Sequence, residues 1–173
     1  MNYAPVNFYA ARQAQPMIAR DEQGDIVFQV SPDRYEVRRQ ITELKDKLLA
    51  ASDQHVEMPV EHIVADGMYI RKLFIKKGTI LVGKIHRKAC INVVAMGDIS
   101  VMTETGSLRI TAGYMQASIA GMQKVGYAHE DTIFMNIFRT DETDIAKIEA
   151  EIACEDYDDF PLIQINSTEA LCL

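Results

Sequence analysis

The sequence predicts a mainly β protein of one domain, in which short antiparallel strands build a sandwich or barrel between helical ends. Three observations favour this class. The chain has 173 residues, 48% of them hydrophobic and 25% charged, which suits one globular domain. Its middle part alternates short β-rich runs with glycine and polar turns, and each end carries one helical pattern. We therefore divide the chain into segments 1–60, 61–139 and 140–173.

The first segment combines an arm with an amphipathic helix. Residues Met1–Val30 show no long period, and we expect an extended arm with a short strand at Ile26–Phe28. Arms of this kind pair readily with a neighbouring subunit. Ser31 and Pro32 can cap and begin a helix of about four turns. The apolar stripe of this helix consists of Val37, Ile41, Leu44 and Leu48. We expect it to dock on the same domain, and the alternative is a coiled-coil seam.

A polar linker at residues 51–59 separates this helix from the β region. Eight runs there have the residue types of strands, at a spacing typical of a sandwich or barrel. They are Tyr69–Ile75, Ile80–His86, Ile91–Ala95, Ser100–Thr103, Arg109–Thr111, Met115–Ile119, Lys124–Tyr127 and Thr132–Phe138.

The third segment returns to helix and ends in a tail. Thr140 can cap a helix whose first turn holds the acids Asp141 and Glu142. Isoleucines then follow on one face of this helix. An acidic turn comes next, and Leu162–Ile165 has some strand character.

Charge and cysteine content exclude several classes of protein. The net charge of −7 argues against a general nucleic-acid binder. No stretch approaches the roughly 20 apolar residues of a membrane helix. The three cysteines show no paired spacing and no signal peptide is visible, which favours a reduced, intracellular setting. Between Gly67 and Gly97 there are seven basic residues and no acidic one. Either the acidic C-terminal segment packs against this basic stretch, or the stretch binds an anion.

Two stretches of the β region repeat a regular spacing of glycines and polar residues. In the first, glycines begin and end the stretch, and polar positions follow the first glycine by six, eight and twelve residues. The second starts at another glycine and has a glycine eight residues later and a lysine eleven residues later. The residues are Gly78, Lys84, His86, Cys90 and Gly97 in the first stretch, and Gly113, Gly121, Lys124 and Ala128 in the second.

These spacings resemble the two motifs of the cupin superfamily, G-x5-H-x-H-x3-E-x6-G and G-x5-P-x-G-x2-H-x3-N, over about Ala65–Phe138. The resemblance implies an antiparallel jelly-roll barrel. Of the four metal-ligand positions, only His86 keeps the family residue, and two hold lysines. An ammonium group has no lone pair to donate to a metal ion. We therefore expect a metal-free barrel without a cofactor.

The chain also resembles cupin-like proteins encoded by tailed bacteriophages. In those relatives a histidine is common where Cys90 stands here, and another where Phe138 stands. The stretches that carry this resemblance are Ile75–Thr79, Gly83–His86, Ala120–Gly121, Gly126–Thr132 and Thr140–Asp144.

The cupin positions define a candidate ligand site. Residues two apart on a strand share a face, and the resemblance implies that Lys84 and His86 point into the barrel. Two interpretations stay open: the lysine stems pack while their ammonium groups reach the barrel mouth, or the groups bind a phosphate or carboxylate. We assign no catalytic residue. The candidate anion pocket consists of Lys84, His86, Cys90, Lys124, Tyr114 and Tyr127.

Three hypotheses for function follow. The first is a non-enzymatic, phage-encoded structural or accessory component, in the bacterial host cytoplasm or the virion. It would form homo-oligomers through its arm and helices, and would contact other virion proteins. The second is a module that sequesters an anionic small molecule such as a nucleotide. The third is a metal-independent nucleotide-sugar epimerase or isomerase, with His86 as base and Tyr114 or Tyr127 as acid.

Overall fold

The computed structural model describes residues 17–31, 33–51 and 54–160. The beginning of the predicted arm, the tail strand and Cys172 lie outside the described residues. The strands are β1 (Ile18–Arg20), β2 (Ile26–Phe28), β3 (Val60–Ala65), β4 (Met68–Ile75), β5 (Ile80–Val82), β6 (Ile85–His86), β7 (Cys90–Met96), β8 (Asp98–Thr103), β9 (Gly106–Thr111), β10 (Met115–Ser118), β11 (Val125–Ala128), β12 (Thr132–Arg139) and β13 (Ala153–Cys154). The helices are α1 (Arg34–Ala50), α2 (Ile145–Ile152) and the 3-10 turn η2 (Tyr157–Asp159).

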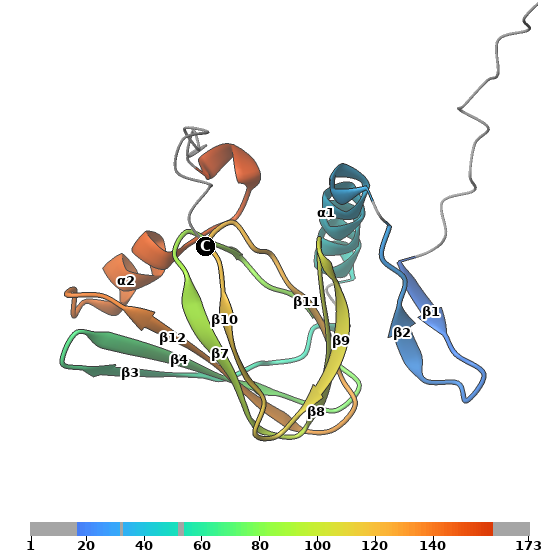
Figure 1. The fold of residues 1–173 in the computed structure, drawn as a ribbon, viewed down its shortest axis with the longest axis horizontal. Coiled ribbons are helices and arrows are strands. Elements are labelled where there is room, and N and C mark those ends of the chain that lie inside the picture. Colours follow the sequence, from blue (N-terminus) through green and yellow to red (C-terminus); the bar gives the residue numbers. More distant parts are fainter. Residues whose placement is uncertain (1–16, 32, 52–53, 161–173) are drawn as a thin grey trace, which may run out of the picture.

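Two antiparallel sheets face each other and form the barrel (Figure 1). One has the strand order β10-β7-β12-β4-β3 and the other the order β5-β11-β8-β9. Strands that follow one another in the chain alternate between the sheets at β7–β8 and again from β10 to β12, which is the connectivity of a jelly roll. The prediction of a mainly β, single-domain jelly-roll fold is confirmed.

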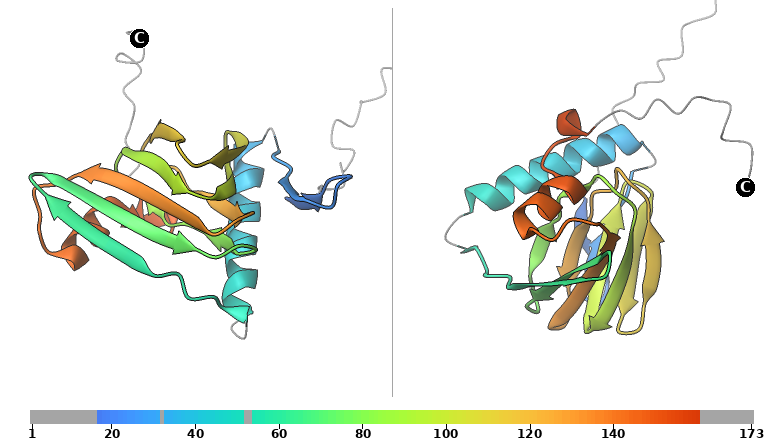
Figure 2. Two further views of the ribbon diagram at one scale, coloured as in Figure 1. Left: turned by 90° about the horizontal axis from the view of Figure 1, so that it is seen from below. Right: turned by 90° about the vertical axis from the view of Figure 1, so that its left-hand side faces the viewer.

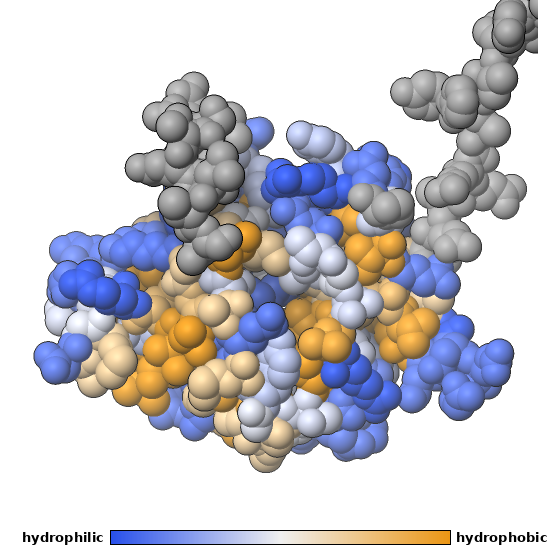
Figure 3. Space-filling model, viewed as in Figure 1, coloured by the Kyte–Doolittle hydropathy of each residue, from blue (hydrophilic) through white to orange (hydrophobic). Residues whose placement is uncertain are grey.

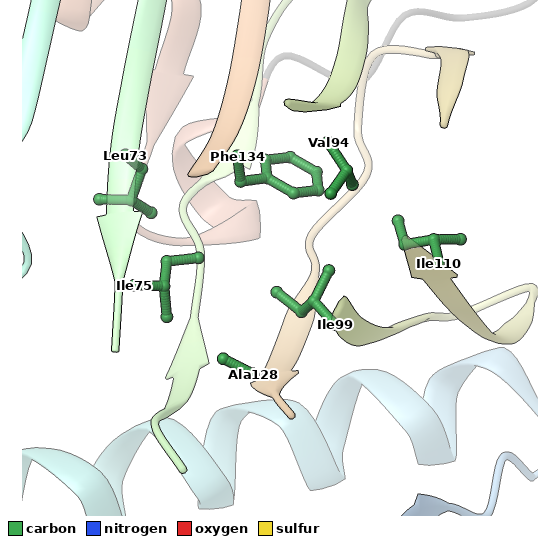
Figure 4. Close-up of a cluster of buried hydrophobic side chains, with 7 residues drawn as sticks. All are labelled: Leu73, Ile75, Val94, Ile99, Ile110, Ala128 and Phe134. Carbon is green, nitrogen blue, oxygen red and sulfur yellow. The ribbon is translucent and has the colours of Figure 1, made fainter. Parts of the chain in front are cut away.

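The core lies between the two sheets, where inward-facing side chains from both meet (Figure 4). The alternation of strand side chains explains which residues take part, because every second residue of a strand faces inward. Phe134 and Val94 come from the five-stranded sheet and Ile99 from the other. The complete buried cluster is Leu73, Ile75, Val94, Ile99, Ile110, Ala128 and Phe134.

The motif glycines occupy turns that need a left-handed backbone, which confirms their reading as turn residues. Gly78, Gly97, Gly113 and Gly121 have φ angles of 81°, 92°, 92° and 82°. At Gly97, between β7 and β8, close packing adds a second reason. A Cβ atom there would lie 2.4 Å from the carbonyl oxygen of Asp131.

Helix α1 and the β1–β2 hairpin cover the outer face of the four-stranded sheet (Figure 2). Val37 and Ile41 are buried against Met102 and Val125 of that sheet, so the apolar stripe docks on its own chain. The short strand predicted at Ile26–Phe28 is confirmed as β2. The expectation of an extended arm is wrong for residues 17–30, because they fold back as this hairpin and Phe28 joins the same cluster.

Several predicted boundaries are wrong for local reasons. Asp33, not Ser31, caps α1 by accepting a hydrogen bond from the Tyr35 amide. Asp144 caps α2, whereas the Thr140 hydroxyl donates to Glu151. The predicted strand at residues 80–86 divides into β5 and β6. Strand β3 was not predicted, because it follows the polar linker and carries polar residues on an exposed edge.

The acidic C-terminal segment packs against the basic stretch, as one of the two readings of the charge pattern predicted. Glu155 Oε1 lies 3.0 Å from Lys84 Nζ. Glu149 Oε1 lies 3.2 Å from Arg71 Nε, and Glu151 pairs with Lys88. These pairs place α2 and β13 over one end of the barrel. Within the described residues no helix is long and apolar enough to cross a membrane.

The outer face of the five-stranded sheet is almost entirely apolar. Strand register aligns one row across all five strands, Ile63, Ile70, Ile137, Ile91 and Ala117. In the left view of Figure 2 neither helix lies in front of these strands, and orange apolar surface is visible at the lower left of Figure 3. Besides that row, the face holds Met68, Phe74, Val93, Met96, Met115, Ile133 and Met135, with Glu61, Lys72 and Arg139 as its charged residues.

Candidate functional site

A cavity of about 270 Å³ lies between the sheets, beneath α2 and β13. Its floor is apolar, because it is the upper surface of the core cluster. Its other end holds all of the charged and most of the polar side chains. The apolar floor includes Leu73, Ile75, Leu81, Ile99, Val101 and Phe134, and the polar end consists of Arg71, Lys84, His86, Lys124, Asn136 and Glu149.

Lys124 is a partly buried cation that lines this cavity. It directly precedes β11, where the Gln123 side chain fixes the backbone by donating to the Gly83 carbonyl over 3.0 Å. The Lys124 ammonium group donates to Ser118 Oγ at 3.1 Å. No carboxylate of the described residues lies within 4.0 Å of it. Burial therefore lowers the pKa of Lys124. An ammonium group has three donors, so a single neutral partner leaves it able to bind an acceptor from the cavity.

His86 lies on β6 beside Lys124 and is largely shielded from water. Its ring meets Phe138 edge-on at 5.3 Å between centroids. Burial, followed by the positive charges of Lys124 and Arg71, lowers the pKa of His86 to about 3. The imidazole is therefore neutral at pH 7, and one ring nitrogen can accept a hydrogen bond. A histidine with so low a pKa is a weak general base.

Cys90 lies behind His86, and it is not among the residues that line the cavity. Its Sγ is 3.4 Å from His86 Nδ1 and 3.5 Å from Asn92 Oδ1. Asn136, which does line the cavity, donates to the same Asn92 oxygen at 2.8 Å. Burial raises the pKa of Cys90, so the group is a thiol at neutral pH. It supports the histidine and does not act as a nucleophile.

Lys84 occupies the rim of the cavity, and half of its side chain is exposed. Glu155 binds its ammonium group and also accepts from Lys45 of α1 at 3.2 Å. Hydrogen bonding to Lys84 lowers the pKa of Glu155. The charge of Lys84 is therefore already paired, which distinguishes it from Lys124.

The two predicted tyrosines do not line the cavity. Tyr127 is on β11, and alternation turns it to the side where α1 packs, so it joins the cluster under that helix and meets His129 edge-on. Tyr114 packs at the margin of the core, and its hydroxyl donates to Gln116. The structure thus brings Lys84, His86 and Lys124 together and leaves both tyrosines elsewhere.

A second polar group at the mouth was not found from the sequence. Arg71 on β4 and Glu149 on α2 form an ion pair there. Tyr69 donates to Glu149 Oε1 at 3.2 Å, and its oxygen is 2.7 Å from His62 Nδ1. Burial and then the Glu149 carboxylate raise the pKa of Tyr69. Alternation from the apolar Leu73 and Ile75 could have indicated that Arg71 faces inward, whereas no local signal brings Glu149 to this place.

The donor set at the four motif positions does not fit the divalent metal ion that the motif spacing implies. Two positions carry ammonium groups, and one of these is bound to Glu155. His86 and Cys90 are the two motif residues that can bind a metal ion, and these two ligands alone cannot fill a tetrahedral site. Among the described residues, no group of three His, Cys, Asp or Glu side chains is placed to hold an ion.

No family model and no curated protein matches this sequence. Similar solved structures include KdgF from Halomonas sp., at 18% identity and a TM-score of 0.45, covering 53% of this chain and 88% of that chain. Ectoine synthase from P. lautus has 15% identity and a TM-score of 0.44, and covers 50% and 66% of the two chains.

A cupin-2 domain containing protein from Shewanella frigidimarina has 14% identity and a TM-score of 0.40, and covers 55% of this chain and 91% of that chain. At identities and scores this low, these likenesses carry no conclusion about activity, ligand or assembly. The fold assignment rests on the two sheets described above.

Proposed function

We propose that this protein binds a small anionic molecule inside its barrel, with the acid group on Lys124 and a compact apolar body on the cavity floor. The observation that carries the proposal is the Lys124 ammonium group, which is partly buried and has the neutral Ser118 hydroxyl as its partner. Burying a charge without a counter-charge destabilises a protein. An anionic ligand would supply that counter-charge.

The cavity also limits the size of the ligand. Its volume of about 270 Å³ is just below the usual range of roughly 300–1,000 Å³ for small-molecule sites. It suits a small carboxylic acid or a phosphate monoester with an apolar body, and is too small to enclose a nucleotide sugar. The neutral His86 and the Asn136 amide can orient oxygen atoms of the ligand. The low pKa of His86 weighs against its use as a base, so we rank the epimerase hypothesis last.

A thermal-shift panel tests this proposal directly. It should contain inorganic phosphate, aliphatic and aromatic carboxylates, and nucleoside monophosphates. We expect members with an apolar body to raise the Tm of the wild-type protein, and Lys124→Met to lose this shift. Loss of one charged hydrogen bond should weaken binding about 10- to 100-fold.

Lys147→Met is the matched control, because Lys147 lies on α2 with 71% of its side chain exposed and does not line the cavity. It should keep the full ligand shift. An unchanged shift in Lys124→Met, or no shift with any member of the panel, would refute the proposal.

A second candidate is the homo-oligomeric structural or accessory role implied by the likeness to phage-encoded proteins. The apolar outer face of the five-stranded sheet favours an assembling protein. Residues 17–30 do not support assembly through that part of the arm, since they pack on α1 of the same chain. Deletion of residues 1–16 followed by a mass measurement tests the arm itself. A wild-type monomer, or an oligomer unaffected by the deletion, would count against assembly through the arm.

A further inference from the structure

The two sheets of the barrel differ in what covers their outer faces. The four-stranded sheet is covered by α1 and the β1–β2 hairpin. The five-stranded sheet has no such cover among the described residues, and yet its outward side chains are mainly apolar. Met115, Met68 and Met96 on this face are 66%, 51% and 45% exposed. Solvated faces of antiparallel sheets normally carry polar residues, so strands that are apolar on both sides indicate a sheet covered on both sides.

The size of this face matches a protein interface. Five strands about 4.8 Å apart span roughly 24 Å. Strands β4 and β12 have 8 residues each, which at about 3.3 Å per residue gives about 26 Å. The other three strands are shorter, with 7, 6 and 4 residues, so the projected area is about 520 Å², and side-chain relief makes the accessible area larger. A standard interface buries about 800 Å² on each partner. An apolar patch of this size is at the upper end of what monomers expose, and such patches are often interaction sites.

The chemistry of the face favours a second copy of the chain as its occupant. One extended segment of the same chain would cover about 10 Å of the width, less than half of the sheet. The face is also close to neutral, whereas the whole chain carries a net charge of −7. Lys72 pairs with Glu61 at 2.9 Å and lies 5.0 Å from the Phe74 ring centre. Two copies can therefore meet here without the repulsion that other surfaces would cause.

We propose that two copies associate face to face through the five-stranded sheet, about a twofold axis near Met135 and Ile137. These residues are on β12, the central strand of the sheet. The twofold arrangement is the commonest for soluble homo-oligomers. The dimer does not depend on whether the cavity binds a ligand. It uses a different surface from the arm and helices, so the two modes of assembly can be separated by experiment.

The mass of the full-length protein in solution, measured by sedimentation equilibrium over a range of concentrations, tests the inference. We expect about 39 kDa, twice the chain mass of 19.5 kDa. Met135→Glu places a charge from each copy at the centre of the interface, where it would be buried without a partner. It should weaken association at least about 100-fold and give the monomer mass.

Ile91→Glu on β7 is a second variant, and it answers the question if Met135→Glu does not fold. Ile91 is 37% exposed on the same face. Leu49→Glu is the matched control, because Leu49 is an apolar residue 61% exposed on α1. Circular dichroism should show native spectra for the variants that are compared, and Leu49→Glu should keep the dimer mass.

Three results would overturn the inference. The first is a wild-type mass of 19.5 kDa at every concentration. The second is a dimer that persists in the folded glutamate variants, which is the result expected of assembly through the arm. The third is dissociation of the Leu49→Glu control. None of these results depends on ligand binding, so the proposed function is tested separately.

Discussion

Replacing Lys124 by methionine should stabilise the ligand-free protein while weakening its ligand binding about 10- to 100-fold. Methionine keeps an unbranched stem of similar length, so packing around the stem is preserved. The substitution removes the ammonium group from a place where burial lowers its pKa. The effective cost of burying one ion is several kcal/mol. Against this gain stands the loss of the charged hydrogen bond to Ser118, at about 1.5–3 kcal/mol. We expect a net gain of about 2 kcal/mol, or about 4–8 °C in Tm for a domain of this size.

Urea unfolding followed by circular dichroism measures this difference. The midpoint should increase in Lys124→Met without a change in slope. Lys147→Met, at an exposed position, should change stability by no more than about 0.5 kcal/mol. A less stable Lys124→Met protein would refute the reasoning, because it would mean that the ammonium group is fully satisfied without a ligand.

The pH dependence of this gain has a definite sign. Because the folded-state pKa of Lys124 is lowered, the folded chain releases this proton at a lower pH than the unfolded chain. Wild-type stability therefore increases between the lowered pKa and about 10.4. The advantage of Lys124→Met should decrease over the same interval. A constant difference would show that Lys124 does not titrate abnormally.

Three further predictions concern the histidine, the turn at Gly97 and the docked helix. The pKa of His86 is about 3 in the folded protein and 6.5 in the unfolded chain, so the wild-type protein should lose stability as the pH falls below 6.5. This loss should exceed that of His86→Gln by at most about 5 kcal/mol, and parallel pH profiles of the two proteins in urea unfolding would contradict the prediction. Gly97→Ala should lower the free energy of unfolding by at least about 3 kcal/mol. Gly24 has a similar φ of 85° but no atom within 4 Å of the added Cβ, so Gly24→Ala should lower it by only about 1 kcal/mol, and similar Tm losses in the two variants would refute the steric argument. Ile41→Ala, at a position 1% exposed, should cost about 2–5 kcal/mol in one cooperative transition, and α1 melting separately from the barrel would show that the helix is not part of the domain.

The features that the sequence predicted well are those encoded locally. The turn glycines are recognisable because a left-handed backbone at positions such as Gly97 requires glycine. Most strands follow from short apolar runs between such turns. The cap of α1 was misplaced by two residues, since Ser31 and Asp33 are both suitable caps and only Asp33 bonds the first turn. When two nearby residues are equally suitable caps, the sequence alone does not show which of them caps the helix.

The candidate site was predicted only in part, because its members come from distant segments of the chain. Motif spacing indicated Lys124 and His86. Alternation could have excluded Tyr127, because it follows Lys124 by three residues and strand residues an odd number apart face opposite sides. Glu149 reaches the cavity through docking of α2, which no local pattern specifies.

The ion pairs around Glu155 have a consequence for how fast a ligand can reach the cavity. Glu155 joins Lys84 of the rim to Lys45 of α1, and Arg38 of the same helix stacks on Tyr157 at 4.1 Å. The segment after β13 is thus tied to the rim of the cavity and to α1 by contacts that salt weakens. Ligand association and release should both accelerate as ionic strength increases, even where the equilibrium affinity falls. The C-terminal segment would then set the residence time of the ligand, and Lys124 its affinity.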